Sequence, residues 1–315
     1  MRMKGFLLMV LEVLSILFQV MLPLSIPVVV GAILVRFKGL ETKNILTLVL
    51  YFLMPGMVFE TLMTAEVSFS DVYKTLSFCI LNVFLLWLVA KLLGKALKLP
   101  SPERAGLTLV STLTNSVNYG IPLVLLAFGQ LGLDKASVYV IIQLFIVNTV
   151  GVYFAARSNF SVKNAVKSVF SLPTIYAALL ACTLRFFHVG LPAGIEKGAA
   201  MIAAAYSPVV LAILGAQMAG VKNSELNQEA RSTFWWGLFM RLIAAPLIAC
   251  LGLSILQIKG VLFSVLFILS SMPVAVNAVI LSEKFDASPK FVSKCILWTT
   301  LASFIVLPVL IMLVK

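Results

Sequence analysis

Charged residues are scarce in this chain. They make up 11% of its 315 residues, whereas hydrophobic residues make up 61%. Ordinary soluble domains carry about 25% charged residues, so this shortage excludes a soluble fold. The mean hydropathy of +1.09 points the same way. The sequence therefore predicts an all-α polytopic membrane protein whose surroundings are the lipid bilayer.

Catalytic and metal-binding residue types are also scarce. Histidine occurs once, as His188, and nucleophilic catalysis by serine or cysteine needs a base beside the nucleophile. Four cysteines are present, far apart and each inside an apolar segment, without the close spacing that metal sites need: Cys79, Cys182, Cys250 and Cys295. We therefore expect no enzyme, no metal and no cofactor, and we interpret the cysteines as small buried side chains.

Acidic residues are half as frequent as basic ones, which gives a formal net charge of +12. In a soluble chain this excess would suggest nucleic-acid binding. Here the basic residues flank apolar runs instead of forming a block, so we expect no nucleic-acid partner and interpret the charge as topology information.

The chain divides into ten apolar runs, each near the roughly 20 residues that cross a bilayer core. No soluble domain fits between them. The predicted spans are 13–35, 44–64, 73–94, 105–130, 135–156, 170–188, 193–220, 232–255, 260–282 and 290–314.

Lysine and arginine are unevenly distributed over the joints between these spans. Fifteen lie in joints after odd-numbered spans and eight on the other side. Cytoplasmic joints carry the excess of basic residues, so both termini are predicted to lie outside the cell membrane, although Arg2 and Lys4 favour the opposite local orientation.

Prolines recur with a nearly constant offset between the two halves of the chain. Because five spans is an odd number, a second copy would enter the membrane from the opposite side, as in inverted-repeat transporters. We therefore predict two inverted five-helix units, residues 1–157 and 158–315. The matched pairs are Pro23 and Pro173, Pro55 and Pro208, and Pro122 and Pro273.

Two stretches inside these spans combine helix breakers with amides. An interrupted helix leaves backbone groups unpaired, which hydrocarbon does not tolerate but a ligand can satisfy. Two converging helix N-termini would favour an anion there. The alternative is that the amides only hydrogen-bond between helices. The predicted substrate-binding residues are Asn115, Asn118, Gly120, Ile121, Pro122, Pro273 and Asn277.

Three further polar residues inside spans are candidates for coupling or support. Glu60 could carry a proton or reach interfacial water, and the interfacial interpretation is favoured. Arg241 could neutralise an anion or hydrogen-bond carbonyls near a helix break beside Pro246, and the sequence does not separate these roles. Asn148 is more typical of a contact between helices.

Three segments resemble the auxin efflux carrier family. The stretch "TLTNSVNYGIPLVLLAFG" is similar to the fourth-span motif of that family, "MPVAVNAVILSEKFDASPKF" to its ninth and tenth spans, and "LYFLMPGMVFETL" to its second. The resemblance covers essentially the whole chain and fits a compact, prokaryote-like member, because the joint from Arg157 to Ser171 is short. It implies ten helices in two inverted repeats, with broken helices four and nine crossing.

The resemblance also implies a function. Family members move organic anions, such as malonate-like or malate-like dicarboxylates and auxin-like monocarboxylates, and an elevator form of alternating access is expected. It implies that Asn115 meets the substrate carboxylate and that Gly120 and Pro122 form the first break. Where plant members have a further proline this chain has Ala278, after Asn277, so the second half of the site departs from the pattern. A homodimer is left open.

Two other function classes compete with transport. A membrane sensor would need a cytosolic domain or docking tail, and we expect none. A channel is disfavoured because inverted repeats with broken helices normally serve alternating access.

Overall fold

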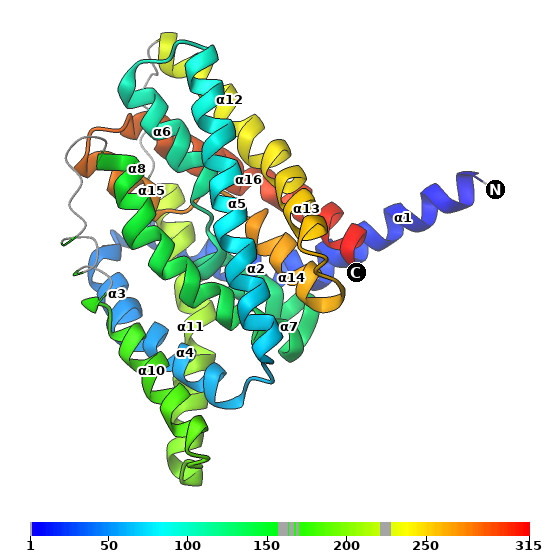
Figure 1. Cartoon of the computed structure of the whole chain (residues 1–315), viewed down its shortest axis with the longest axis vertical. Helices are drawn as coiled ribbons and strands as arrows, with labels where there is room; N and C mark the ends of the chain where they lie inside the picture. The colour runs from blue at the N-terminus through cyan, green and yellow to red at the C-terminus, as the bar shows by residue number, and fades with distance from the viewer. Residues whose placement is uncertain (1, 157–162, 164–166, 168–169, 221–227) are drawn as a thin grey trace.

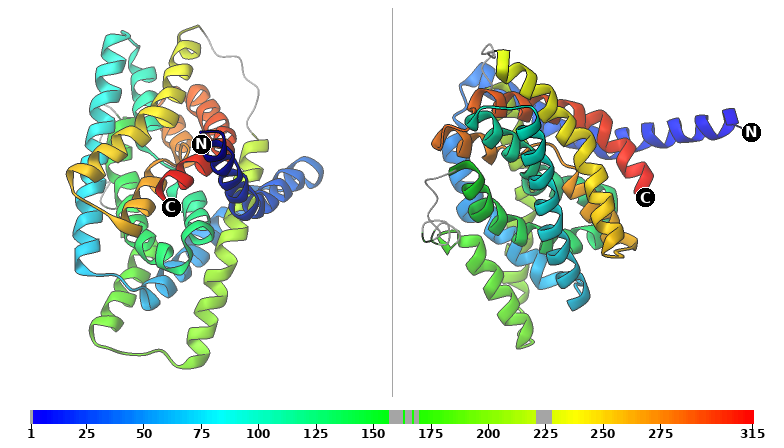
Figure 2. Two further views of the ribbon diagram at one scale, coloured as in Figure 1. Left: turned by 90° about the vertical axis from the view of Figure 1, so that its right-hand side faces the viewer. Right: turned by 45° about the horizontal axis from the view of Figure 1, so that its top comes forward.

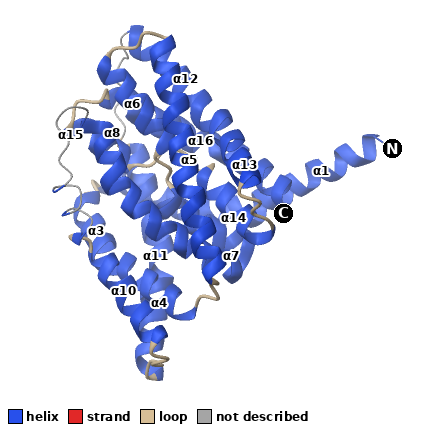
Figure 3. Cartoon of the chain, in the orientation of Figure 1, coloured by secondary structure: helices blue, strands red, loops and turns tan. Residues whose placement is uncertain are grey.

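The computed structural model describes residues 2–156, 163, 167, 170–220 and 228–315. All regular structure in these residues is helical, without a strand (Figure 3). The predicted all-helical membrane class is therefore confirmed. The predicted boundary between residues 157 and 158 lies outside the described residues. Among the described residues, seven helices are long and apolar enough to cross a membrane: Met9–Lys38, Thr42–Thr64, Phe69–Ala96, Ser116–Ala155, Ala193–Ala219, Ala230–Ile255 and Pro289–Val314.

Several of these long helices are built from shorter elements. Two additional apolar helices, α10 and α14, are shorter than those seven. The α-helices are α1 (Arg2–Ile16), α2 (Leu22–Lys38), α3 (Thr42–Leu48), α4 (Met54–Thr64), α5 (Phe69–Ala96), α6 (Ser101–Thr112), α7 (Ile121–Ile146), α8 (Val152–Ala156), α10 (Pro173–Phe186), α11 (Ala193–Ala219), α12 (Gln228–Phe239), α13 (Ala245–Ile255), α14 (Gly260–Ser270), α15 (Asn277–Lys284) and α16 (Pro289–Val314). The π-helical turns are η1 (Leu17–Met21), η2 (Val49–Leu53), η3 (Ser116–Gly120), η4 (Val147–Gly151) and η5 (Met240–Ala244).

Four of the five π-helical turns end two residues before a proline. In an α-helix the proline ring clashes with the carbonyl four residues earlier. A π turn widens the helix at that point, and the residue after it bonds five residues back, as Leu22 does to Leu17. These prolines therefore sit inside continuous helices and do not interrupt them: Pro23, Pro55, Pro122 and Pro246.

The helices pack into two groups (Figure 1 and Figure 2). In the first group, α11 packs against α2 and α4, and α10 packs against α4. The contact between α2 and α11 is close: a Cβ added at Gly31 would lie 1.8 Å from the Ala212 carbonyl oxygen, and one at Gly215 would lie 1.7 Å from that of Val28. Small residues at helix contacts are typical of membrane bundles. The second group contains α5 to α7 and α12 to α16, while α1 contacts α16 at one end and projects from the molecule at its N-terminal end (Figure 1).

The joint between α4 and α5 is held from two sides. Arg185, at the end of α10, donates to the Ala65 carbonyl at 2.5 Å. From α7, Lys135 donates to the Glu66 carbonyl at 2.7 Å, and the Asp134 carboxylate accepts from the Glu66 N–H at 3.0 Å. The joint between α4 and α5 therefore contacts both the end of α10 and the part of α7 that follows its break in helical geometry at Gly129.

Candidate functional site

Two helices of the second group are interrupted in the interior of the protein. Helix α6 ends at Thr112, and the chain runs extended from Leu113, with φ −97° and ψ 114°, before η3 begins at Ser116. Helix α14 ends at Ser270, and helical structure resumes only with α15 at Asn277. Both interruptions are short non-helical segments flanked by helices.

The two interrupted segments pair with each other through their backbones. The Asn115 N–H donates to the Pro273 carbonyl at 2.8 Å, and the Ala275 N–H donates to the Leu113 carbonyl at 2.9 Å. The pairing is the antiparallel bridge between Thr114 and Val274. Each segment thus satisfies backbone groups that the other leaves unpaired, which is the condition for non-helical backbone inside a membrane protein.

The Asn115 side chain carries free hydrogen-bond donors at this crossing. The residue is only 2% exposed, and its Nδ2 has no hydrogen-bond partner among the described residues. The backbone carbonyl of Asn115 accepts from the N–H groups of Tyr119 and Gly120, so Asn115 also starts the helix that follows. A buried amide nitrogen without a partner is costly. Its two N–H donors therefore suit an acceptor oxygen of a bound ligand.

Hydroxyl groups from neighbouring helices support both interruptions. The hydroxyl of Tyr139, on α7, lies beside the side chains of Thr114 and Ser116. Thr299, on α16, accepts from the Val274 N–H at 3.2 Å. Tyr139 and Thr299 each lie 25 residues after the middle residue of the segment that they support. The sequence analysis missed both residues, although this equal spacing could have indicated them.

Gly120 and Pro122 do not form the first interruption, which corrects the sequence prediction. Gly120 is helical, with φ −70° and ψ −39°, and Pro122 lies in the first turn of α7 after a π turn that accommodates its ring. Glycine is needed at position 120 for space, because a Cβ there would lie 2.7 Å from Leu269 Cδ2. The neighbouring Ile121 is buried. The segment that leaves helical geometry lies five or more residues upstream.

The second interruption also differs from the expected arrangement. Pro273 lies within the interrupted segment, whereas Pro122 is helical, so these two prolines are not equivalent. The residue that mirrors Asn115 in the backbone pairing is Ala275. Asn277 lies two residues further on, is exposed and begins α15. Asn277 is therefore not the counterpart of Asn115 in the backbone pairing, and its role in binding stays a prediction.

Arg241 joins the ends of the two upstream half-helices. Its side chain is fully buried, with one terminal nitrogen donating to the Ser111 carbonyl at 2.9 Å and the other to the Ser270 carbonyl. These carbonyls belong to the last turns of α6 and α14, where a helix has no partner of its own for them. Of the two roles considered for Arg241, the structure supports the bonds to carbonyls.

The remaining candidates make local contacts. Asn118 is half-buried and its Oδ1 accepts from the Tyr206 hydroxyl at 3.4 Å. Asn148 donates to the Leu144 carbonyl one turn earlier in its own helix, at 2.8 Å. Glu60 is half-buried in α4, where its charge is repelled by Asp134. Among the described residues, no three acidic, histidine or cysteine side chains cluster so as to hold a metal ion.

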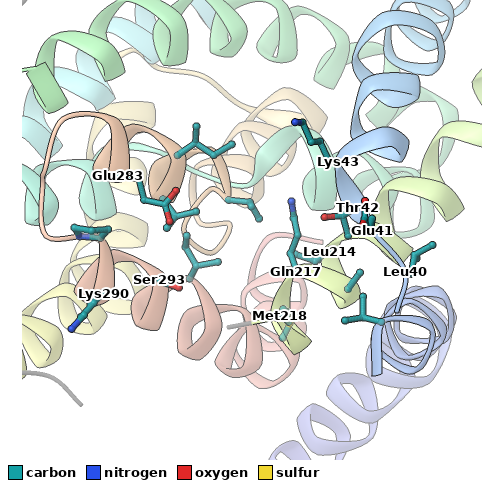
Figure 4. Close-up of a pocket in the computed structure, with 18 residues that line it drawn as sticks. Leu40, Glu41, Thr42, Lys43, Leu214, Gln217, Met218, Glu283, Lys290 and Ser293 are labelled. Atoms are coloured by element: carbon teal, nitrogen blue, oxygen red, sulfur yellow. The ribbon is translucent and has the colours of Figure 1, made fainter. Parts of the chain in front are cut away.

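A cavity of about 880 Å³ opens beside the second interruption (Figure 4). Its walls come from the joint between α2 and α3, the end of α11, and the helices α15 and α16. It reaches Val276, the residue immediately before α15, and so ends at the N-terminus of that helix. The polar side chains around it are those of Glu41, Thr42, Lys43, Gln217, Glu283, Lys290 and Ser293.

Comparison with known proteins identifies the family. Residues 16–311 match the model of a family described as "Membrane transport protein". The chain belongs to this family. It is the family of the auxin efflux carriers, so the resemblance found in the sequence is confirmed. The match covers both interrupted helices and both helical groups apart from the last residues of α16, and it leaves out nearly all of α1.

Two archaeal relatives span most of the chain. An uncharacterized transporter from Methanocaldococcus jannaschii is 28% identical over 282 residues, which cover 86% of this chain and 89% of the relative. An uncharacterized transporter from Methanothermobacter thermautotrophicus is 29% identical over 259 residues, covering 81% and 83%. Both names describe transporters, as does that of the family, and neither describes an enzyme.

Proposed function

We propose that this protein is a secondary transporter or facilitator that moves small organic anions across the cell membrane. The substrates would be carboxylates, such as malonate-like or malate-like dicarboxylates or auxin-like monocarboxylates. The observation that carries this proposal is the buried Asn115 amide, whose Nδ2 lacks a partner at the crossing of two interrupted helices. A carboxylate oxygen is the ligand atom that best satisfies these donors.

The two helix starts at the crossing favour an anion. Helices η3 and α15 both begin at the crossing, and a helix N-terminus carries roughly half a positive charge. No acidic residue occurs in either interrupted segment, 113–115 or 271–276. Because the attraction rests on dipoles and hydrogen bonds rather than on a contacting cation, affinity in the micromolar to millimolar range is expected, roughly −8 to −4 kcal/mol.

Ten membrane crossings arranged as two inverted repeats account for the way the joints gather. The joints after the first and ninth predicted spans and the end of the seventh span supply residues around the cavity. The joint after the second span is bonded by Lys135, at the start of the fifth span, and by Arg185, near the end of the sixth. The cavity thus lies at one end of the odd-numbered spans, and the bonded joint lies at the opposite face. This arrangement is expected if every predicted span crosses the membrane. The cavity face is then cytoplasmic and both termini lie outside.

The two helical groups suggest which part moves. Helices α2, α4, α10 and α11 belong to the first two predicted spans of each repeat and would form a scaffold. The interrupted helices belong to the other group and would carry the substrate as an elevator. The cavity has walls from both groups, with Leu214 from the scaffold and Val276 from the moving part, which fits a conformation open to the cytoplasm.

Transport by the purified protein in liposomes tests the proposal. A panel of labelled mono- and dicarboxylates is offered with and without imposed gradients of pH, sodium and voltage. Saturable uptake of at least one carboxylate is expected, and the gradient that accelerates it identifies the coupling. Uptake of neutral or cationic solutes with none of the carboxylates would refute the substrate class.

Accessibility labelling tests the topology. In a cysteine-free background, a single cysteine at Lys163 should react only from the cytoplasm and one at Lys197 only from outside. Reaction of both from one side would contradict the ten-crossing inverted repeat.

A further inference from the structure

Two interrupted helices bring charges of both signs to their crossing. The upstream halves α6 and α14 end there and each contributes roughly half a negative charge, while the downstream halves begin there and contribute positive charge. These contributions oppose one another. A crossing of bare helix ends would therefore select weakly between anions and cations.

Arg241 changes this balance because it contacts only the C-terminal ends of the upstream helices, which carry the negative charge. Its two terminal nitrogens bind the Ser111 and Ser270 carbonyls, in the last turns of α6 and α14 respectively. One full positive charge thus meets two half negative charges. The positive helix starts at Ser116 and Asn277 have no such counterpart in the described contacts.

The charge of Arg241 is not used in an ion pair. In the part of the chain that the structure describes, the one pair of opposite charges within 4.0 Å is Lys135 with Asp71. The Nε of Arg241 is also buried without a hydrogen-bond partner among these residues. Among the described residues, the guanidinium therefore faces backbone carbonyls and lies near Tyr139, with no carboxylate within 4.0 Å.

We propose that Arg241 sets the charge selectivity of the crossing. By cancelling the negative ends of α6 and α14, it leaves the positive ends of η3 and α15 unopposed, so that an anion is favoured beside Asn115. Arg241 is a positioning residue in this scheme, because it acts through the helix ends and does not contact the substrate. This inference rests on the proposed transport of organic anions.

The expected effect can be scaled from distance. Ser111 and Asn115 are four residues apart, at most about 13 Å even for extended chain. A unit charge about 10 Å away at an effective dielectric constant of about 20 changes the affinity for a singly charged ligand roughly tenfold. A neutral ligand of the same shape should be almost unaffected.

The test compares variants that separate charge from hydrogen bonding. Arg241→Gln removes the charge and retains an amide that can donate to a carbonyl, whereas Arg241→Lys retains the charge with a different donor geometry. Arg185→Gln is the matched control, since Arg185 also donates to carbonyls at a helix end, at Leu62 and Ala65, but away from the crossing.

Binding of acids and their neutral amides to purified, monodisperse protein gives the readout. The probes are malonate with malonamide and indole-3-acetate with indole-3-acetamide. Arg241→Gln should lower the acid-to-amide affinity ratio roughly tenfold, while Arg241→Lys and Arg185→Gln should keep the ratio within about threefold of the wild type. A purely structural role would weaken acid and amide equally.

Each result decides the matter. An unchanged ratio in Arg241→Gln overturns the role of Arg241 while leaving anion transport intact. If the glutamine variant does not fold, the lysine variant decides: a retained ratio supports the role of charge, and a tenfold loss in folded protein overturns it. If the wild type binds neither acid better than its amide, the proposed substrate class fails and this inference fails with it.

Discussion

The two interrupted helices share a backbone arrangement but differ in their side chains. Leu113 and Asn115 pair with Ala275 and Pro273 through two nearly equal hydrogen bonds, of 2.9 and 2.8 Å. The position that carries an amide in the first segment carries a methyl group in the second. Geometry at the crossing is therefore built by both halves of the chain, whereas the donor chemistry is concentrated on the first.

The supporting residues differ in the same way. Tyr139 lies beside polar side chains of the first segment, while Thr299 accepts a hydrogen bond from a backbone N–H of the second. In the first segment the neighbouring helix contacts polar side chains. In the second it satisfies a backbone N–H that would otherwise be unpaired. This difference predicts that substitutions in the first segment change binding and that substitutions around the second change stability.

Asn115→Ala should give the largest effect. It removes donors that would bind a carboxylate, and hydrogen bonds to charged groups contribute about 1.5–3 kcal/mol each, so affinity should fall roughly a hundredfold. The fold should survive, because Nδ2 has no protein partner among the described residues. Binding of malonate or indole-3-acetate, together with size-exclusion chromatography, measures both. Normal binding by this variant would exclude Asn115 from the site.

Gly120→Ala tests how closely the two interrupted helices must approach. The added Cβ would lie 2.7 Å from Leu269 Cδ2 and 3.3 Å from Met272 Cγ, so these side chains must shift, at a cost of about 1–3 kcal/mol. A lower thermal midpoint in detergent is expected. Gly190→Ala is the control, since a Cβ there meets nothing within 4 Å. Equal midpoints for the two variants would disprove the tight contact.

Thr299→Val should weaken the support of the second segment. The valine has the shape of threonine but cannot accept from the Val274 N–H, which leaves that buried donor unpaired at a cost of about 1–2 kcal/mol. Thr299→Ser retains the acceptor and should be close to the wild type. Thermal unfolding compares the three proteins. A valine variant as stable as the serine variant would refute this support.

Asn277→Ala should have the smallest effect. Asn277 is exposed, lies two residues beyond the paired segment and mirrors no polar residue of the first segment. Malonate or indole-3-acetate affinity should change less than about threefold, or under ~0.7 kcal/mol. A loss as large as that of Asn115→Ala would restore the symmetric two-amide site that the sequence alone suggested.

Local sequence signals identified the membrane class and the family, and they found the interrupted helices to within a few residues. The exact location of the first interruption was missed because Gly120 and Pro122 are strong helix breakers in isolation. A π turn before Pro122 and the close approach of Leu269 to Gly120 keep both residues helical. Such compensation depends on neighbours that a local pattern does not include.

Long-range contacts account for the other gaps. The partners of Arg241 lie 130 and 29 residues away in the chain. Nothing in the sequence around Arg241 distinguishes a bond to carbonyls from contact with an anion. Likewise, the match of Pro122 with Pro273 relied on spacing, whereas the backbone pairing that defines equivalent positions joins residues 160 apart.

The pairing across the crossing has a consequence for the synthesis of the protein. The hydrogen-bond partners of the Leu113 carbonyl and the Asn115 N–H lie about 160 residues later in the chain and are synthesised after them. At about 5–20 residues per second, a ribosome needs roughly 8 to 30 s to make that distance. During this interval the first half holds unpaired backbone groups that lipid cannot satisfy, so it must stay next to the insertion machinery or water until the second half arrives. The two halves, made as separate chains, should therefore accumulate only when they are produced together.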